Sequence, residues 1–513
     1  MNKEVRVRFA PSPTGPLHIG GVRTALYNYL FARHYGGNFI LRIEDTDQSR
    51  FVGGAEEYIK ESLSWLDILP DEGIDDNGPH KPYRQSARKE IYNKYAQQLI
   101  DNKLAYYAFD TPEDLENMRN RLKSEGISMP QYNGHSRGSM VNSLTLSPEE
   151  VYDKIKSGEK YVIRLLVPEN ENIEFSDLIR GKVSVSSDTI DDKILIKSDG
   201  LPTYHLANVV DDHLMNITHV IRGEEWLPSA PLHILLYQFM GWEDSMPEFA
   251  HLPLILKPEG TGKLSKRDGD KHGFPVFPID WIDPVTGDKS AGFREKGYLP
   301  GAMVNFLAFL GWNPGTEQEL FGMNDLVKEF SIERVNKAGA KFDIEKAKWY
   351  NQQYIKFIPD DDIGAYLFNE LNEKGIKANL EYVTRVAIAF KERITFLHEI
   401  YGISSYFFIR PETYDEKVIK KRWTTTNVEF LSKYAAELNK SYEKFDGDLA
   451  KNIMLPILDK MSIGMGSIMQ VLRVAITGVT SGIDLIYTID LLGHREVSKR
   501  IEIAIERLGN FVK

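Results

Sequence analysis

The sequence predicts an α/β protein with a parallel sheet, followed by an all-helical C-terminal part. The first fifty residues alternate between strand, glycine-rich turn, helix and strand, and such a βαβ unit almost always implies parallel strands. Beyond about residue 315 apolar residues recur at helical spacing, as at Val383, Val386, Ala387, Phe390 and Ile394. The 513 residues are enough for roughly three or four domains.

The composition excludes several classes of protein. Hydrophobic residues make up 42% and charged residues 27%, which is typical of a packed globular protein and not of a disordered one. The net charge of −11 excludes a wholly basic nucleic-acid coat but allows local basic patches. The chain has no cysteine, so disulfides, thiolate metal ligands and a cysteine nucleophile are excluded. The N-terminus lacks the apolar core of a signal peptide, and no run approaches the ~18 apolar residues of a membrane span, so we expect a cytoplasmic protein with no membrane partner.

The βαβ unit at the N-terminus is predicted in four steps. Residues 5–9 alternate between apolar side chains and arginine, which is typical of a strand. Residues 10–21 contain three prolines, two of them one residue apart, and three glycines, which favour a turn that approaches a ligand closely. A helix with one apolar face then begins at Val22 and stops near Gly36, and residues 38–43 form a second strand.

Polar residues of this unit meet at one edge of the predicted sheet. Ligands of a parallel sheet bind beyond the carboxyl ends of its strands, and Arg8, the loop from Ser12 to Gly21 and Glu44 fall there. The start of the helix offers free N–H groups and a positive dipole end, which suit phosphate. His18, just before the helix, can hydrogen-bond a phosphate. For an isolated loop, a Pro/Gly turn with a structural histidine is the more common explanation.

A family resemblance decides between these explanations. The segment from Pro11 to Gly20 resembles the HIGH-type motif of class I aminoacyl-tRNA synthetases, in the form used by glutamyl-tRNA synthetases. Further segments are similar to motifs of that family in the same order; they are residues 43–50, 201–213, 220–227, 263–267 (the KMSKS-like lysine loop), 330–335 and 472–478. Because the segments span nearly the whole chain, neither chance nor a generic nucleotide binder explains them.

The resemblance implies a particular fold and domain organisation. It implies a Rossmann-type doubly wound parallel sheet with an inserted acceptor-binding domain, followed by all-α anticodon-binding domains. The implied domains are the first half of the Rossmann catalytic domain (1–105), the inserted tRNA acceptor-binding domain (106–195), the second Rossmann half with the stem-contact region and lysine loop (196–325), a helical stem-contact domain (326–390) and a helical anticodon-binding domain (391–513).

The resemblance also implies a two-step reaction. L-glutamate attacks the α-phosphate of ATP, which gives glutamyl adenylate and pyrophosphate, and the terminal adenosine of tRNA(Glu) then takes the glutamyl group on its 2′-hydroxyl. Neither step needs a protein nucleophile; both need positioning and neutralisation of negative charge. The implied partners are tRNA(Glu), ATP with Mg²⁺ and L-glutamate. The family further implies a monomer whose activation step requires the tRNA.

Candidate residues for ATP chemistry lie at two distant places in the sequence. The resemblance gives one end of the triphosphate to His18 and the other to Lys263 and Lys266, which are therefore the predicted catalytic residues. Alone, the lysine loop would be a solvated charge run; the upstream motif favours catalysis. The predicted ATP site consists of Ser12, Thr14, His18, Gly20, Glu225, Leu256, Lys263 and Lys266. Trp226 is left out, because a buried tryptophan is more often part of the core than a ligand.

Selection of glutamate over glutamine is a charge problem, because the two have nearly the same shape. A buried guanidinium pairs with a carboxylate but is left unpaired by an amide. Arg8 and Arg222 are the candidates, and Glu44 would receive the substrate ammonium. The predicted glutamate site consists of Arg8, Ala10, Ser12, Glu44, Tyr204, Asn208 and Arg222. A salt bridge from Arg222 to Glu224 or Glu225 and core packing of Tyr204 are the structural alternatives.

Two stretches depart from the family pattern. Many relatives hold zinc in the inserted domain through paired cysteines, whereas here Asp110 and His135 stand at the corresponding stretches and do not make a closed tetrahedral site. We therefore predict no zinc and no other protein-bound metal, with Asp45 and Asp47 holding a loop. Residues 270–294, rich in glycine, proline and aspartate, look like an insertion that could modulate the lysine loop.

Near the far end, basic residues 417–422 precede Trp423. This suits phosphate contact and base stacking, or equally a solvated helix face over a core tryptophan.

Four other functions fit the sequence less well than a glutamyl-type synthetase. Glutaminyl specificity carries less weight, because the motifs resemble the bacterial glutamyl form. The stand-alone enzyme that glutamylates a modified base lacks the helical part, which here follows Phe330 for about 180 residues. A small nucleotidyltransferase would not need that part. A tRNA-binding regulator would be expected to have lost His18 or the lysine loop.

Overall fold

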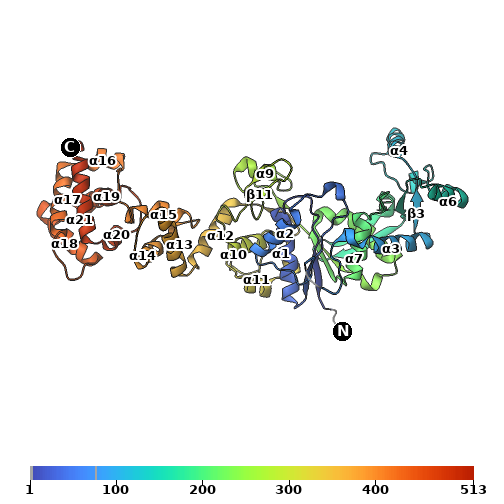
Figure 1. Cartoon of the computed structure of the whole chain (residues 1–513), viewed down its shortest axis with the longest axis horizontal. Helices are drawn as coiled ribbons and strands as arrows, with labels where there is room; N and C mark the ends of the chain where they lie inside the picture. Colours follow the sequence, from blue (N-terminus) through green and yellow to red (C-terminus); the bar gives the residue numbers. More distant parts are fainter. Residues whose placement is uncertain (1–3, 76–77, 513) are drawn as a thin grey trace. The chain divides into compact units, whose positions relative to one another are not determined.

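The computed structural model describes residues 4–75 and 78–512. The chain forms two compact units with a boundary between Ala347 and Lys348. All strands of the described residues belong to the first unit, and the second unit consists of helices, drawn in orange and red in Figure 1. No helix among the described residues combines the length and apolar character that crossing a membrane requires. The predicted fold class, a parallel α/β sheet followed by an all-α region, is confirmed.

The central sheet is parallel and reverses its direction of progression once. β1 (Arg6–Phe9) pairs with β2 (Asn38–Leu41), and β8 (His219–Gly223) pairs with β9 (Glu248–Leu252), both in parallel. The Thr218 N–H donates to the Arg6 carbonyl at 2.9 Å, which places β8 beside β1. The order is therefore β2-β1-β8-β9, and the reversal falls between β1 and β8. Open α/β sheets bind ligands at the carboxyl end of such a switch point.

Helix α1 (Ile19–His34) follows β1 and begins earlier than the sequence predicted. His18 is its N-cap, and the His18 Nδ1 accepts the N–H of Gly20 at 3.1 Å. Gly20 and Gly21 therefore lie in the first helical turn and not in a loop. A Cβ at Gly21 would lie 2.6 Å from Leu17 Cδ1, so any larger residue there would have to displace the end of the Leu17 side chain. The other helices and strands that complete the sheet region are α2 (Ala55–Trp65), α3 (Lys89–Asp101), α7 (Tyr204–Leu214), α8 (Ala230–Phe239), β10 (Ile255–Leu256), α10 (Pro300–Ala308), α11 (Met323–Glu329) and β13 (Ala340–Lys341).

The stretch between residues 105 and 196 contains a small sheet and part of the central one. β3 (Ala105–Ala108), β4 (Val162–Leu165) and β7 (Ile194–Ile196) form an antiparallel sheet, in the order β3-β4-β7. The hairpin of β5 (Asn172–Asp177) and β6 (Gly181–Ser186) pairs with β9 through β5 and so extends the central sheet. The helices of this stretch are α4 (Pro112–Ser124), α5 (Gly134–Arg137) and α6 (Pro148–Lys156). The finer domain boundaries stay predictions.

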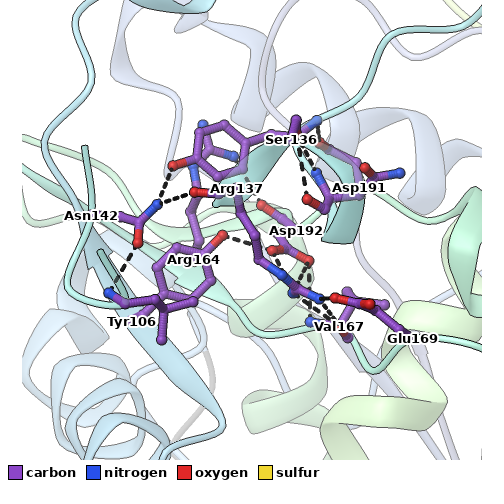
Figure 2. Close-up of polar contacts among 12 residues, drawn as sticks. Tyr106, Ser136, Arg137, Asn142, Arg164, Val167, Glu169, Asp191 and Asp192 are labelled. Carbon is purple, nitrogen blue, oxygen red and sulfur yellow. Dashed lines mark hydrogen bonds and ion pairs between the residues drawn. The ribbon is translucent and has the colours of Figure 1, made fainter. Parts of the chain in front are cut away.

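A network of buried polar side chains lies within this stretch (Figure 2). Asp192 is fully buried and accepts hydrogen bonds from Tyr106 Oη at 2.6 Å and from Arg137 at 2.9 Å. Asp110, at the position considered for zinc, accepts from the Tyr132 hydroxyl at 2.7 Å and from the Val141 N–H. Its carboxylate oxygens therefore already have protein donors.

We expect the stability of this stretch to depend on the Asp192 network and not on zinc. Asp192→Leu leaves Arg137 buried without its main partner, so the free energy of unfolding should fall by about 3 kcal/mol. EDTA treatment of the wild-type protein should change neither the melting temperature nor the activity. Differential scanning calorimetry measures the loss of stability in Asp192→Leu and the melting temperature after EDTA treatment, and an activity assay completes the EDTA test. Metal analysis that found a stoichiometric tightly bound ion would contradict the prediction.

Residues 270–294, predicted to be an insertion that modulates the lysine loop, form a packed segment. β11 (Trp281–Ile282) and β12 (Lys289–Ser290) make a short antiparallel hairpin. The Val276 carbonyl accepts the N–H of Ile19 at 3.0 Å, and the Tyr58 hydroxyl of α2 donates to the Ile279 carbonyl at 2.6 Å. The segment therefore joins the end of the lysine loop to α1 and α2. Its effect on the loop stays a prediction.

The helical unit has its own core. Its helices pack pairwise, with α17 against α18 and α21. Trp423 is completely buried in that core, whereas Lys417 and Lys420 are exposed. Trp423 is therefore a core residue, as one of the two interpretations predicts, and base stacking by its ring is excluded because no face of the ring is accessible. Phosphate contact by the exposed lysines stays a prediction. The helices from the unit boundary onward are α12 (Ile344–Lys356), α13 (Asp360–Glu373), α14 (Leu380–Phe390), α15 (Glu399–Ser404), α16 (Glu416–Arg422), α17 (Thr425–Leu438), α18 (Gly447–Met461), α19 (Met465–Thr477), α20 (Leu485–Leu492) and α21 (His494–Arg507).

Candidate active site

A cavity of about 490 Å³ opens at the carboxyl ends of β1 and β8, where the strand order reverses. Its wall includes the loop after β1, the first turn of α1, the start of α7 and the end of β8. The predicted site residues that line it are Arg8, Ala10, Ser12, His18, Gly20, Glu44, Tyr204, Asn208, Arg222, Glu225 and Lys263. The fold thus brings most of the predicted ATP and glutamate residues to one place.

Three predicted residues lie outside that lining. Thr14 borders an adjoining cavity that shares Ser12, Glu44 and Tyr204 with the first. Leu256 is half-buried and forms a bridge with Lys263, next to Ile255, which does line the cavity. Lys266 is exposed at the first position of a short helix, α9 (Lys266–His272), so the predicted flexible loop is partly helical.

His18 has one ring nitrogen available at the cavity. Its Nδ1 accepts the Gly20 N–H, so in the neutral ring the proton resides on Nε2. Burial lowers the pKa of His18 to about 4, and the Lys263 cation adds to the shift, so the ring is neutral at pH 7. The Nε2 atom is buried and has no hydrogen-bond partner among the described residues. A neutral Nε2–H donor therefore remains for a phosphate oxygen.

The N-terminus of α1 does not offer the free N–H groups that the sequence predicted. The Ile19 N–H donates to the Val276 carbonyl and the Gly20 N–H donates to His18 Nδ1. No local pattern in the sequence indicates that residues 274–277 reach back to this helix. Only the helix dipole and the His18 side chain remain for an anion here.

The ion pairs at the cavity rim show whether Arg222 forms the salt bridge with Glu224 or Glu225 that was its structural alternative. Glu225 accepts from Lys263 at 2.6 Å, and Glu224 pairs with Arg180 at 2.6 Å. Neither glutamate pairs with Arg222, so the predicted structural alternative is not realised. Because Lys263 and Glu225 are both substantially exposed, their pair contributes little to stability and can open at small cost.

Beneath the cavity, Arg8 belongs to a buried charge network that the sequence did not reveal. Its Nε and one terminal nitrogen donate to the two oxygens of Asp212, at 3.0 and 3.1 Å. Arg42 also donates to Asp212, at 2.7 Å, and to Glu44, at 3.1 Å. Burial raises the pKa of Glu44, although Arg42 and Arg8 oppose the shift. Arg8 is thus already matched by a carboxylate, which separates its role from that of Arg222.

Arg222 is 5% exposed and has neutral partners only. It donates to the Tyr204 hydroxyl at 2.6 Å and to His251 Nε2 at 3.0 Å. Among the residues that the structure describes, no carboxylate forms an ion pair with it. Tyr204 therefore contacts the arginine at the cavity and is not simply part of the core.

Trp226 is another residue whose place differs from the prediction. It is 41% exposed, lines the cavity, and its ring lies 4.3 Å from that of Tyr204 between centroids. The expectation of a buried core tryptophan is wrong, because the 3₁₀ turn after β8 places the side chain at the rim. Its apolar face is available to a planar ligand such as a base.

The neutral state of His18 predicts a pH-dependent stability. Its folded pKa of about 4 lies below the ordinary histidine pKa of 6.5, so the unfolded chain binds more protons between these values. Stability linked to His18 is fully present above pH 6.5 and is lost as the pH falls toward 4. His18→Asn keeps a capping acceptor but does not titrate. The stability advantage of the wild type over this variant, measured by urea unfolding, should therefore shrink by about 3 kcal/mol from pH 7 to pH 4. A pH-independent difference would contradict a buried neutral imidazole.

The fold and the cavity define an α/β enzyme with a nucleotide-type switch-point site. Comparisons with known proteins are specific. A family model described as tRNA synthetases class I (E and Q), catalytic domain, matches residues 4–349, and a model described as an anticodon binding domain matches residues 353–505. The chain belongs to the class I tRNA synthetases of the glutamate and glutamine group.

Individual relatives match over their full length. A glutamate–tRNA ligase of Cytophaga hutchinsonii is 55% identical over 100% of this chain and 99% of its own, and one of Porphyromonas gingivalis is 53% identical over 99% and 100%. A crystal structure of a glutamate tRNA ligase from Elizabethkingia meningosepticum, in complex with its amino acid, superposes with a TM-score of 0.94 at 48% identity, over 99% of this chain and 100% of that chain.

Proposed function

We propose that this chain is a glutamate–tRNA ligase that forms glutamyl adenylate from L-glutamate and ATP and transfers glutamate to the 3′-terminal adenosine of tRNA(Glu), releasing AMP and pyrophosphate. The names of its full-length relatives support the activity. The observation in this chain that carries the choice of glutamate is Arg222, a buried guanidinium at the cavity with no carboxylate partner among the described residues.

The charges of the cavity suit glutamate better than glutamine. A side-chain carboxylate would supply the anion that Arg222 lacks, whereas an amide would leave the buried cation unpaired. Tyr204 Oη, 2.6 Å from the Arg222 guanidinium, lies close enough to contact the same carboxylate. The substrate ammonium is assigned to Glu44, with Arg8, Ala10, Ser12 and Asn208 around the remainder of the amino acid.

ATP is assigned to the other part of the cavity. His18 Nε2–H would donate to a phosphate oxygen, and Lys263 would neutralise charge on the triphosphate after leaving Glu225. Ser12, Thr14, Gly20, Glu225 and Leu256 complete the proposed nucleotide site, and Lys266 joins it when α9 moves.

Mg²⁺ is assigned to the bound nucleotide, because phosphate oxygens are the hard ligands that it prefers. Within residues 4–75 and 78–512 no group of three or more histidine, aspartate or glutamate side chains is arranged to hold a metal ion. Asp45 instead accepts from the N–H and hydroxyl of Ser86, so it holds the loop.

The remaining assignments follow the family. We assign residues 1–105 and 196–325 to the catalytic halves, 106–195 to the tRNA acceptor end, 326–390 to the stem contact and 391–513 to the anticodon. We further assign the enzyme to the cytoplasm as a monomer.

ATP–pyrophosphate exchange tests the proposal. Exchange should depend on L-glutamate and on tRNA(Glu), and L-glutamine at the same concentration should give no more than a few per cent of that rate. Exchange with glutamine and not with glutamate would assign the other amino acid of the family. Exchange with neither, under conditions where the protein is folded, would refute a ligase.

A further inference from the structure

Three neighbouring strands of the central sheet carry a line of buried polar side chains that ends at the cavity. Asp177 is the last residue of β5, His251 lies in β9 and Arg222 in β8. Asp177 lies where β5 pairs with β9, and Arg222 and His251 are direct partners in the ladder between β8 and β9. The three residues are 3%, 0% and 5% exposed. The line therefore connects the hairpin β5–β6 with the guanidinium at the cavity.

The hydrogen bonds along this line have only one consistent proton arrangement. The His251 Nδ1 lies 2.6 Å from Asp177 Oδ2, and the Arg222 Nε–H donates to His251 Nε2 at 3.0 Å. A ring that accepts at Nε2 must carry its proton on Nδ1, and Asp177 holds it there. Burial lowers the pKa of His251, the hydrogen bond to Asp177 opposes the shift and the Arg222 cation adds to it, which agrees with the neutral ring that the Arg222 hydrogen bond to Nε2 requires.

We propose that Asp177 and His251 are positioning residues for Arg222, which hold its guanidinium at the cavity wall without neutralising its charge. The neutral imidazole accepts the Nε–H, so the contacts of the two terminal nitrogens are with Tyr204 and His233 on one and with the Trp226 carbonyl on the other, all of them neutral groups. A carboxylate directly on the guanidinium, as Asp212 lies on Arg8, would compete with the carboxylate of the substrate. Because the His251 imidazole lies between the Asp177 carboxylate and the guanidinium, Asp177 does not compete with the substrate. The inference rests on the proposed function, in which Arg222 binds the side chain of glutamate.

A purely structural role is the competing explanation. Asp177 also accepts the backbone N–H groups of Ile179, Arg180 and His251, at 3.0, 2.8 and 3.1 Å, and so fastens the end of β5 to β9. Loss of such a fastening would loosen the sheet and affect ATP and glutamate alike. Loss of positioning at Arg222 would raise the KM for glutamate selectively. The ratio of the two KM values therefore separates the explanations.

Three variants test the proposal in ATP–pyrophosphate exchange with tRNA present. His251→Leu removes the acceptor for Arg222, and the glutamate KM should rise about 10- to 100-fold while the ATP KM changes less than about twofold. Asp177→Asn turns an N–H toward His251 Nδ1 and favours the opposite tautomer, so the glutamate KM should rise about tenfold or more. His251→Gln keeps one acceptor and one donor, and we expect it to restore the glutamate KM to within about fivefold of the wild type.

The controls separate failure of this inference from failure of the proposed function. His219→Leu changes a half-buried histidine of β8 that bonds Thr218 and contacts no residue of the line, and it should leave both KM values unchanged. Arg222→Gln is the reference. If Arg222→Gln raises the glutamate KM and the His251 and Asp177 variants do not, or raise both KM values in parallel, the positioning role is refuted. If Arg222→Gln itself leaves the glutamate KM unchanged, the proposed glutamate pocket is refuted as well.

Discussion

Arg222→Gln is expected to raise the KM for glutamate by about 100-fold or more, because a buried charge-assisted pair costs about 3 kcal/mol or more to lose. The cavity brings no carboxylate to Arg222 among the described residues, so the substrate supplies the counter-charge in full. The amide of the glutamine variant carries no charge, and its single NH2 group cannot form the two parallel hydrogen bonds that a guanidinium makes to a carboxylate. Its preference should therefore shift from glutamate toward glutamine.

Pyrophosphate exchange with both amino acids measures this change. The KM for ATP should stay within about twofold, since Arg222 lies on the side of the cavity that we assign to the amino acid. Arg8→Gln is not an equivalent test, because it also strips Asp212 of a buried partner and should lower stability. Retained glutamate affinity in a folded Arg222→Gln protein would remove this residue from the pocket.

The sequence predicted those parts of the site that local patterns determine. Between Val5 and Ile43 the order of strand, glycine-rich turn, helix and strand indicates a βαβ unit. The switch-point rule then places Arg8, His18 and Glu44 at the carboxyl edge of the sheet. The family motifs added Tyr204 and Arg222, which the structure finds 2.6 Å apart. These residues were predictable because each lies at a strand end or a helix start.

The parts that the sequence missed depend on contacts between distant segments. Asp212 neutralises Arg8 across more than two hundred positions, and His251 reaches Arg222 only because β9 pairs with β8 in that register. The occupation of the α1 N–H groups by Val276 has the same origin. Periodicity reports which face of an element is buried, but it does not report which buried polar groups meet.

Lys266→Ala is expected to lower the rate constant of pyrophosphate exchange by about 100- to 1,000-fold, the effect of removing a cation that stabilises developing phosphate charge. In the structure Lys266 is exposed and lies outside the cavity lining, at the start of α9. Because we propose that Lys266 contacts only the nucleotide, after a movement of α9, the KM for glutamate should stay within about twofold.

Glycines lie on both sides of α9 and suit the proposed movement. Gly262 and Gly273 have φ angles of +111° and +73°, which other residues rarely adopt, and Lys263 between Gly262 and α9 is held by one exposed ion pair. Lys271→Ala, on the same helix and equally exposed, is the matched control and should retain the wild-type exchange rate. Lys266→Arg keeps the charge but not the compact ammonium, so it should recover part of the rate. An unchanged exchange rate in Lys266→Ala would show that α9 does not close over the triphosphate and would leave His18 and Lys263 as the phosphate-binding pair.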